Sequence, residues 1–374
     1  MINIDWVIVR ETKPTQALEF EFADTELRRQ IPASARWLVG AEEAQLQTDT
    51  SLDPGAIVLV LAHTGITLES RCLDRLYLAL QQGFESVAAC DSRAPNPMLG
   101  GGYATLRGME RFVDDYPMHV LALVNPDASP GALVCLTTVG ALRSGARKSV
   151  VSGRVSGAFV HDVSNYFGSD RSEVLGLIPA TANRFLDIGG GEGNFLRLIK
   201  SARGGETHLV EMDIGAATSA KDCGNADHVW NGDFLEYQSS LKFDCISFLD
   251  MLEHVANPEQ CLAHARTLLS VDGVVLASIP NVGHWSVIAD LIEGRWDYVP
   301  SGIHCVTHLR FFTQRTIEDL FDRAGFQIQK IERVVVPGPS VLLDRWQSSY
   351  GLQPNGASLD TYAFLVVGHP KIQV

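Results

Sequence analysis

The stretch DIGGGEGNF, Asp187–Phe195, decides the fold of the second half of this chain. It follows the short apolar run Arg184–Leu186 and precedes apolar residues at helical spacing, so it predicts a strand, a glycine turn and a helix. Glycine lets the backbone turn sharply and lets a ligand lie against it, and the start of a helix offers free N–H groups. Turns of this kind hold nucleotides in α/β proteins. A plain tight turn is the alternative interpretation.

The spacing of the glycines favours one kind of nucleotide. A dinucleotide fingerprint reads G-x-G-x-x-G, whereas Gly189, Gly191 and Gly193 form G-x-G-x-G behind Asp187 at the strand end. This form suits a ligand that has no pyrophosphate and carries a cationic amino-acid part. We expect Asp187 to attract that positive part, directly or through water.

Acidic residues also follow the next predicted strands. Residues 208–213, HLVEMD, predict a second strand that ends in acids, and the carboxylate of Glu211 can accept both hydroxyls of a ribose. Asp233 stands at the following turn, where it could accept a hydrogen bond from an adenine amino group. The remaining candidate contacts to the nucleotide are Met212, Phe234 and Asp250, the last at the end of the predicted strand 243–250.

Three further motifs follow in order. LEHVANP (Leu252–Pro258) comes after the fourth predicted strand and contains a helix start with Asn as the cap. IPN (Ile279–Asn281) ends the fifth predicted strand, and THLRFFT (Thr307–Thr313) comes later. Taken together, these residues resemble the class I methyltransferases that use S-adenosylmethionine, over roughly residues 160–370. The resemblance is to the small-molecule group that carries L-E-H-x-x-x-P, I-P-N and T-H-L-R-F-F-T.

This resemblance implies the fold class and the ligands. It implies an α/β fold with a Rossmann-like, seven-stranded sheet, S-adenosyl-L-methionine as the cofactor and a small molecule as the methyl acceptor. In this group a tyrosine before the first helix often lies over the cofactor, which makes Tyr166 a candidate contact. A surface aromatic that packs on the helix is the alternative. We expect no metal in the site.

Two histidines are candidates for the catalytic base. Methyl transfer from a sulfonium is an in-line displacement in which positioning supplies much of the rate. A hydroxyl acceptor also gains from a base that takes its proton, and histidine is the usual choice, whereas an amine needs only a neutral lone pair. His254 follows the fourth predicted strand and His284 the fifth, at the edge where ligands bind in open α/β sheets. A structural role, capping a carbonyl, is the alternative for each.

The acceptor is expected to meet the segment between the fifth strand and Phe312. That segment is aromatic and flanked by glycines, as expected of a lid, and its candidate substrate contacts are Trp285, Trp296, Tyr298, His304 and His308. A packed surface loop or a dimer contact is the alternative. The resembled group usually carries L-D-R before T-H-L-R, where this chain has His304-Cys305-Val306. We therefore do not transfer the role of that acid to this chain.

The first half also predicts alternating strands and helices. Strand candidates lie at 6–9, 56–62, 86–90 and 132–142, and a helix candidate at 68–83. Part of this half resembles a GT-A glycosyltransferase domain, but Ala62–Gly65 replaces the acidic D-x-D-like pair that would hold a metal and a sugar diphosphate. We therefore predict a smaller, non-catalytic α/β domain at 1–145, a linker at 146–160 and the methyltransferase domain at 161–374.

Composition narrows the class of protein. The formal charge of −14 argues against a nucleic-acid surface, which needs a basic stripe. Seven cysteines without a C-x-x-C pair fit a reducing compartment, and no secretory signal or apolar run of membrane-spanning length is present. The expectation is a cytoplasmic protein without membrane insertion, with a homodimer as an option. Three functions stay open: a methyltransferase acting on a sugar or natural-product hydroxyl, a cofactor-binding scaffold without turnover, and a bifunctional glycosyltransferase-methyltransferase.

Overall fold

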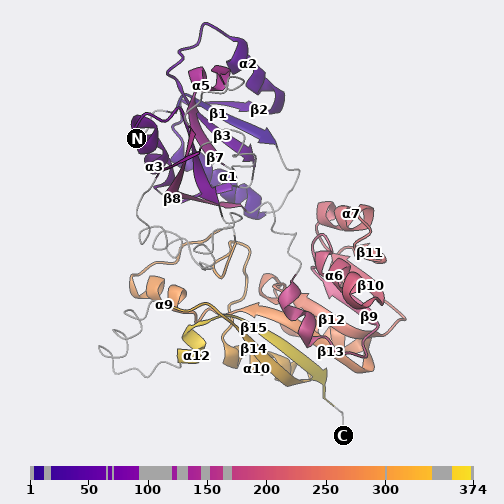
Figure 1. The fold of residues 1–374 in the computed structure, drawn as a ribbon. Coiled ribbons are helices and arrows are strands. Elements are labelled where there is room, and N and C mark those ends of the chain that lie inside the picture. Colours follow the sequence, from indigo (N-terminus) through magenta and orange to yellow (C-terminus); the bar gives the residue numbers. More distant parts are fainter. Residues whose placement is uncertain are drawn as a thin grey trace. The chain divides into compact units, whose positions relative to one another are not determined.

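The chain folds into two compact units. The computed structural model describes residues 4–11, 18–64, 66–69, 71–91, 120–123, 134–144, 152–162, 171–299, 301–338 and 356–371. One unit comprises Met1–Ser164 with Asp297–Ser301, and the other comprises Asn165–Trp296 with Gly302–Val374. Each unit has its own sheet (Figure 1) and its own buried hydrophobic core.

The first unit is built on a mixed sheet with the order β2-β1-β3-β7-β5-β8-β4, and β6 pairs with β8. Strands β1, β2 and β3 are parallel, and β7 lies antiparallel between β3 and β5. The strands are β1 (Trp6–Glu11), β2 (Arg36–Val39), β3 (Ile57–His63), β4 (Ile66–Leu68), β5 (Ser86–Asp91), β6 (Val120–Leu123), β7 (Val134–Thr138) and β8 (Ser152–Asp162). The helices are α1 (Leu18–Gln30), η1 (Gly40–Glu42), α2 (Glu43–Thr48), α3 (Cys72–Gln81) and α5 (Val139–Ser144).

Alternate residues of its central strands face two helical layers. On β3, Leu59 and Leu61 pack with residues of α1 and α3, whereas Val58 and Val60 pack with residues of α2 and α5. This alternation is the period-two pattern of a strand that is covered on both faces. The first unit is therefore a separate three-layer α/β fold, as the sequence predicted. The GT-A resemblance of this half stays a prediction.

The second unit is built on a seven-stranded sheet with the order β11-β10-β9-β12-β13-β15-β14, in which only β15 runs antiparallel to its neighbours. The strands are β9 (Arg184–Ile188), β10 (Glu206–Glu211), β11 (His228–Asn231), β12 (Phe243–Leu249), β13 (Leu269–Pro280), β14 (Phe326–Val335) and β15 (Thr361–Pro370). The helices are η3 (Ser172–Leu177), α6 (Asn194–Arg203), α7 (Ile214–Asp222), η4 (Phe234–Glu236), η5 (Leu252–His254), α8 (Pro258–Leu268), α9 (Trp285–Ile292), α10 (Gln314–Arg323) and α12 (Gly356–Leu359). This is the predicted Rossmann-like sheet.

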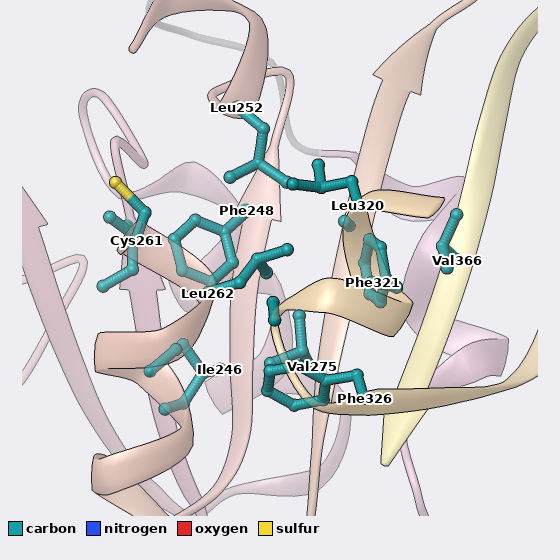
Figure 2. Packing of buried hydrophobic residues seen from close by; sticks show 14 of the residues in the cluster. Ile246, Phe248, Leu252, Cys261, Leu262, Val275, Leu320, Phe321, Phe326 and Val366 are labelled. Carbon is teal, nitrogen blue, oxygen red and sulfur yellow. The ribbon is translucent and has the colours of Figure 1, made fainter. Parts of the chain in front are cut away.

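Helices cover both faces of the second sheet. Ile246 and Phe248 of β12 pack against α8 and α10, whereas Cys245, on the opposite face, packs with α6 and η3. Figure 2 shows the larger cluster, in which side chains of α8 and α10 meet those of β12, β13 and β15. Because helices cover both faces, a ligand can reach polar groups of the sheet at the ends of its strands.

The helix starts are set by local caps. The side chain of Asn257 accepts a hydrogen bond from the Gln260 N–H at 3.1 Å, and Pro258 stands at the first helical position of α8. The predicted cap is therefore confirmed. It fixes where α8 begins after the LEH segment.

Two predicted segments differ from the structure. Most of the predicted linker 146–160 belongs to β8, which pairs with β4, β5 and β6, so the first unit extends to about Ser164. The predicted strand 132–142 ends as β7 at Thr138, where the Thr138 hydroxyl accepts from the Ala141 N–H at 3.1 Å and starts α5. An apolar run of that length fits a strand and a short helix equally well.

None of the helices among the described residues has the length and apolar character needed to span a bilayer.

Candidate functional site

The glycine loop joins β9 to α6 at the carboxyl edge of the second sheet. Gly189, Gly191 and Gly193 have φ of 67°, 56° and 73°, in the left-handed region that favours glycine. A Cβ at Gly190 would lie 2.2 Å from Asp187 Oδ2. The loop is therefore a backbone cradle that requires glycine at these positions.

Glu211, at the end of β10, holds this loop. Its Oε2 accepts from the Gly191 N–H at 2.8 Å and its Oε1 accepts from the Asp213 N–H at 2.8 Å. The residue is only 6% exposed, and burial raises the pKa of its carboxyl group. Glu211 thus links the loop to the next strand, and its role as a ribose acceptor stays a prediction.

Asp187, at the end of β9, is buried under the loop. It is 1% exposed, and its Oδ1 accepts a 2.5 Å hydrogen bond from the Ser247 hydroxyl. Burial raises the pKa of Asp187 to about 7, and this effect exceeds the lowering by Ser247. The carboxyl group can therefore hold or release a proton near neutral pH.

Asp250 and Arg171 form a strained pair beside the loop. They are the two described residues other than glycine with positive φ, 54° and 52°. Arg171 Nη1 donates to Asp250 Oδ2 at 2.6 Å, and the Ser278 hydroxyl donates to Asp250 Oδ1 at 2.6 Å. Residues in sparsely populated backbone regions cluster at ligand sites. Sequence reasoning missed Arg171 because no motif or periodicity marks a single arginine in the segment before β9.

Glu253, His254 and His308 come together at the end of β12. Glu253 is fully buried, and within the described chain its carboxylate oxygens have no hydrogen-bond partner, so burial raises its pKa well above the usual value. His308 Nε2 lies 4.0 Å from Glu253 Oε1, and His308 Nδ1 donates to the Ile303 carbonyl at 2.8 Å. Burial lowers the pKa of His308 to about 3, so its ring is neutral and the contact with Glu253 is not an ion pair.

The same contacts tie two sequence motifs together. The backbone carbonyl of Glu253 accepts from the N–H groups of Leu309 and Arg310, at 2.8 and 3.0 Å. The rings of His254 and His308 meet edge to face, with centroids 4.7 Å apart. Ligand atoms of Glu253, His254 and His308 lie within 4.8 Å of one another, so this cluster could hold a divalent cation. The expectation of a site without metal therefore stays a prediction.

His284 has the surroundings of a structural residue. It is fully buried at the start of α9, its Nδ1 lies 2.9 Å from the Ser286 hydroxyl and its Nε2 lies 3.2 Å from the Val336 carbonyl. Trp285 Nε1 donates to the same carbonyl at 3.1 Å. Burial lowers the pKa of His284 to about 4. With both ring nitrogens engaged and its pKa lowered, His284 is poorly suited to take a proton from an acceptor.

The remaining predicted acceptor residues belong to an aromatic segment. His304 is fully buried and its ring lies 4.1 Å from that of Trp296, which also meets Phe311 edge to face at 5.1 Å. Tyr298 is 45% exposed and belongs to the segment grouped with the first unit. The structure thus brings His254, His308, Phe311, Trp296 and His304 into one chain of ring contacts.

The other predicted cofactor contacts have different environments. Met212 is 67% exposed, and exposed Asp233 caps η4, where its Oδ1 accepts from the Leu235 N–H at 2.9 Å. Phe234 packs in the core against Phe248, and its contact with the cofactor stays a prediction. Tyr166 lies outside the described residues.

Comparison with known proteins agrees with this geometry. Residues 159–331 match the family model described as "Methyltransferase domain". A ubiquinone biosynthesis O-methyltransferase from Histophilus somni (strain 2336) is 29% identical over 136 residues, which cover 33% of this chain and 57% of that protein. The chain therefore spans little more than half the length of that relative.

Solved structures are also similar to part of the chain. A SAM-dependent methyltransferase from Thermotoga maritima is 18% identical with a TM-score of 0.39, over 53% of this chain and 87% of the other. One from Archaeoglobus fulgidus is 19% identical with a TM-score of 0.40, over 55% of this chain and 96% of the other.

The raised pKa of Asp187 predicts a pH-dependent stability. In the folded state Asp187 keeps its proton up to about pH 7, whereas in the unfolded state it loses the proton near its ordinary pKa of 3.8. The contribution of Asp187 to the free energy of unfolding therefore falls as the pH rises from about 4 to about 7. Asp187→Asn removes the effect. Urea denaturation from pH 4 to pH 8 should give a variant whose stability relative to wild type increases with pH. Parallel curves for the two proteins would contradict the assignment.

Proposed function

Because residues 159–331 match the family model of a methyltransferase domain, we propose that this protein transfers a methyl group from S-adenosylmethionine to a small polar acceptor. The observation that carries the proposal is the set of carboxylates around the glycine cradle. Asp187, Glu211 and Asp250 end three neighbouring strands, β9, β10 and β12, at the edge that carries the loop. An edge lined by acids suits a ligand with a sulfonium and an ammonium group.

The proposed cofactor roles follow from chemistry. Glu211 has acceptor capacity beyond its two backbone hydrogen bonds, and a carboxylate can accept from both ribose hydroxyls. Asp187 faces the ammonium group, directly or through water. We assign Arg171 to the α-carboxylate, because among the described residues its hydrogen bonds to Asp250 and Glu173 use Nη1 and Nε, and Nη2 could bind a ligand. Asp233 and Met212 flank the adenine.

The proposed acceptor group is a hydroxyl on a sugar or natural-product intermediate. The oxygen attacks the methyl carbon as the S–C bond breaks, and its proton passes to His254, leaving S-adenosylhomocysteine and the methyl ether. His254 supports this role through its place after β12 and its ring contact with His308. The chain of aromatic rings supplies apolar walls for the acceptor.

Titration with S-adenosylmethionine tests the cofactor assignment. Glu211→Ala should weaken binding by at least ~1.5 kcal/mol, the cost of losing hydrogen bonds to a charged group. Isothermal titration calorimetry measures the change, with the exposed Val271→Ala, a residue 90% exposed, as the control. If wild-type protein does not bind the ligand, the proposed function fails.

The role of Arg171 predicts a selective loss. Arg171→Gln should weaken S-adenosylmethionine by at least about tenfold, since a charge-assisted hydrogen bond is worth roughly 1.5–3 kcal/mol. Decarboxylated S-adenosylmethionine, which lacks the α-carboxylate, should bind the variant and wild type alike. Equal weakening of both ligands would mean that Arg171 acts only by holding Asp250.

The catalytic assignment predicts a separation of binding from turnover. On an identified hydroxyl acceptor, His254→Gln should lower kcat by about 10²–10⁴, while the dissociation constant of S-adenosylmethionine stays unchanged. Single-turnover kinetics measure the step. Near-normal turnover would indicate an acceptor, such as an amine, that needs no base. Cofactor binding without turnover on any acceptor in wild-type protein would favour the scaffold interpretation.

A further inference from the structure

Three metal-ligating side chains converge at the edge of the second sheet opposite the glycine loop. Glu206 and His208 lie at the start of β10, and His228 is the first residue of β11. Residues two apart on a strand share a face, and His208 pairs directly with His228 across the parallel ladder. Strand geometry alone therefore places Glu206, His208 and His228 on one face of the sheet.

Their ligand atoms lie close together. His208 Nε2 lies 3.0 Å and His228 Nε2 lies 3.5 Å from the same oxygen, Glu206 Oε1, and the three atoms lie within 4.8 Å of one another. Ligands bound to zinc at about 2.0–2.1 Å in a tetrahedron are separated by about 3.4 Å. We propose that Glu206, His208 and His228 form a binding site for a transition-metal ion such as Zn²⁺.

The surroundings of the three residues suit this role. Arg184 Nε donates to the other carboxylate oxygen, Glu206 Oε2, at 2.7 Å, so the carboxylate is oriented with Oε1 turned to the histidines. Such outer hydrogen bonds orient metal ligands. His208 packs edge to face on Phe243 and its side chain is 7% exposed, which fixes that ring. Two imidazoles and one carboxylate favour Zn²⁺, Ni²⁺ or Cu²⁺ over Mg²⁺.

One side chain must adjust when the ion binds. The rings of His208 and His228 are stacked 4.4 Å apart with an interplanar angle of 25°, whereas an ion lies near the plane of each ring that binds it. The side chain of His228 is 61% exposed and has room to rotate. The ion would bind the Nε2 atoms of both rings, and each ring would carry its proton on Nδ1 instead. Water would complete the coordination of the ion. The bound ion would join the edge strand β11 to β10.

Metal titration of full-length protein tests the site. After treatment with a chelator, wild-type protein should bind Zn²⁺, and Co²⁺ in its place should give the visible absorption of a tetrahedral complex. His228→Gln should weaken Zn²⁺ by at least about tenfold, because even outer-shell changes cost 10–100-fold, and should remove the rise in Tm on adding Zn²⁺. His228 is exposed, so this substitution leaves the core intact.

The matched control separates this site from the cluster at the catalytic edge. His254→Gln, which removes a ligand of the Glu253 cluster, should keep both the Co²⁺ spectrum and the rise in Tm. The proposal is overturned if wild type binds no Zn²⁺, if His228→Gln binds it as tightly as wild type, or if His254→Gln alone abolishes binding.

Discussion

The link between Glu211 and the glycine loop is the constraint on which the candidate site depends. A loop with three left-handed glycines has many accessible conformations in isolation, and fixing its backbone costs entropy at every residue. The hydrogen bond from the Gly191 N–H to Glu211 joins the loop to β10. The bond from the Gly189 N–H to the Val210 carbonyl, at 2.8 Å, adds a second link to the same strand. The loop is thus shaped before any ligand arrives, and β9, β10 and α6 hold fixed places around it.

Burial shifts several titratable groups at the carboxyl ends of the strands toward their neutral forms. Burial raises the pKa of Glu253 well above its usual value, lowers the pKa of His308 to about 3 and raises that of Asp187 to about 7. In the proposed reaction, a positively charged sulfonium and an oxygen that becomes negative as it loses its proton give neutral products. Attraction between such opposite charges is stronger where water and mobile charges are excluded.

Much of the fold could be predicted from the sequence, because its signals are local. The strand, loop and helix at 184–203, the acids ending β10 and β12, and the cap at Asn257 all follow from spacing and residue type. The linker failed as a prediction because Ser and Gly fit an exposed loop as well as a strand such as β8, whose place depends on its partners. Arg171 and the Glu253–His308 contact were missed for the same reason: each joins residues far apart in sequence. Burial, which separates His284 from His254 as a candidate base, is likewise a property of the whole fold.

The order of the strands also decides when the second sheet can form during synthesis. Its last strand in sequence, β15, lies between β13 and β14 and pairs with both. Until residues 361–370 have left the ribosome, β13 and β14 each present an open edge, and such edges invite pairing with other chains. The strands of the first sheet have all been made by Asp162, so that sheet can close much earlier. Nascent chains that stall before β15 would therefore carry a complete first sheet and an incomplete second sheet that is prone to aggregate. In this state the unpaired strands would depend most on chaperones.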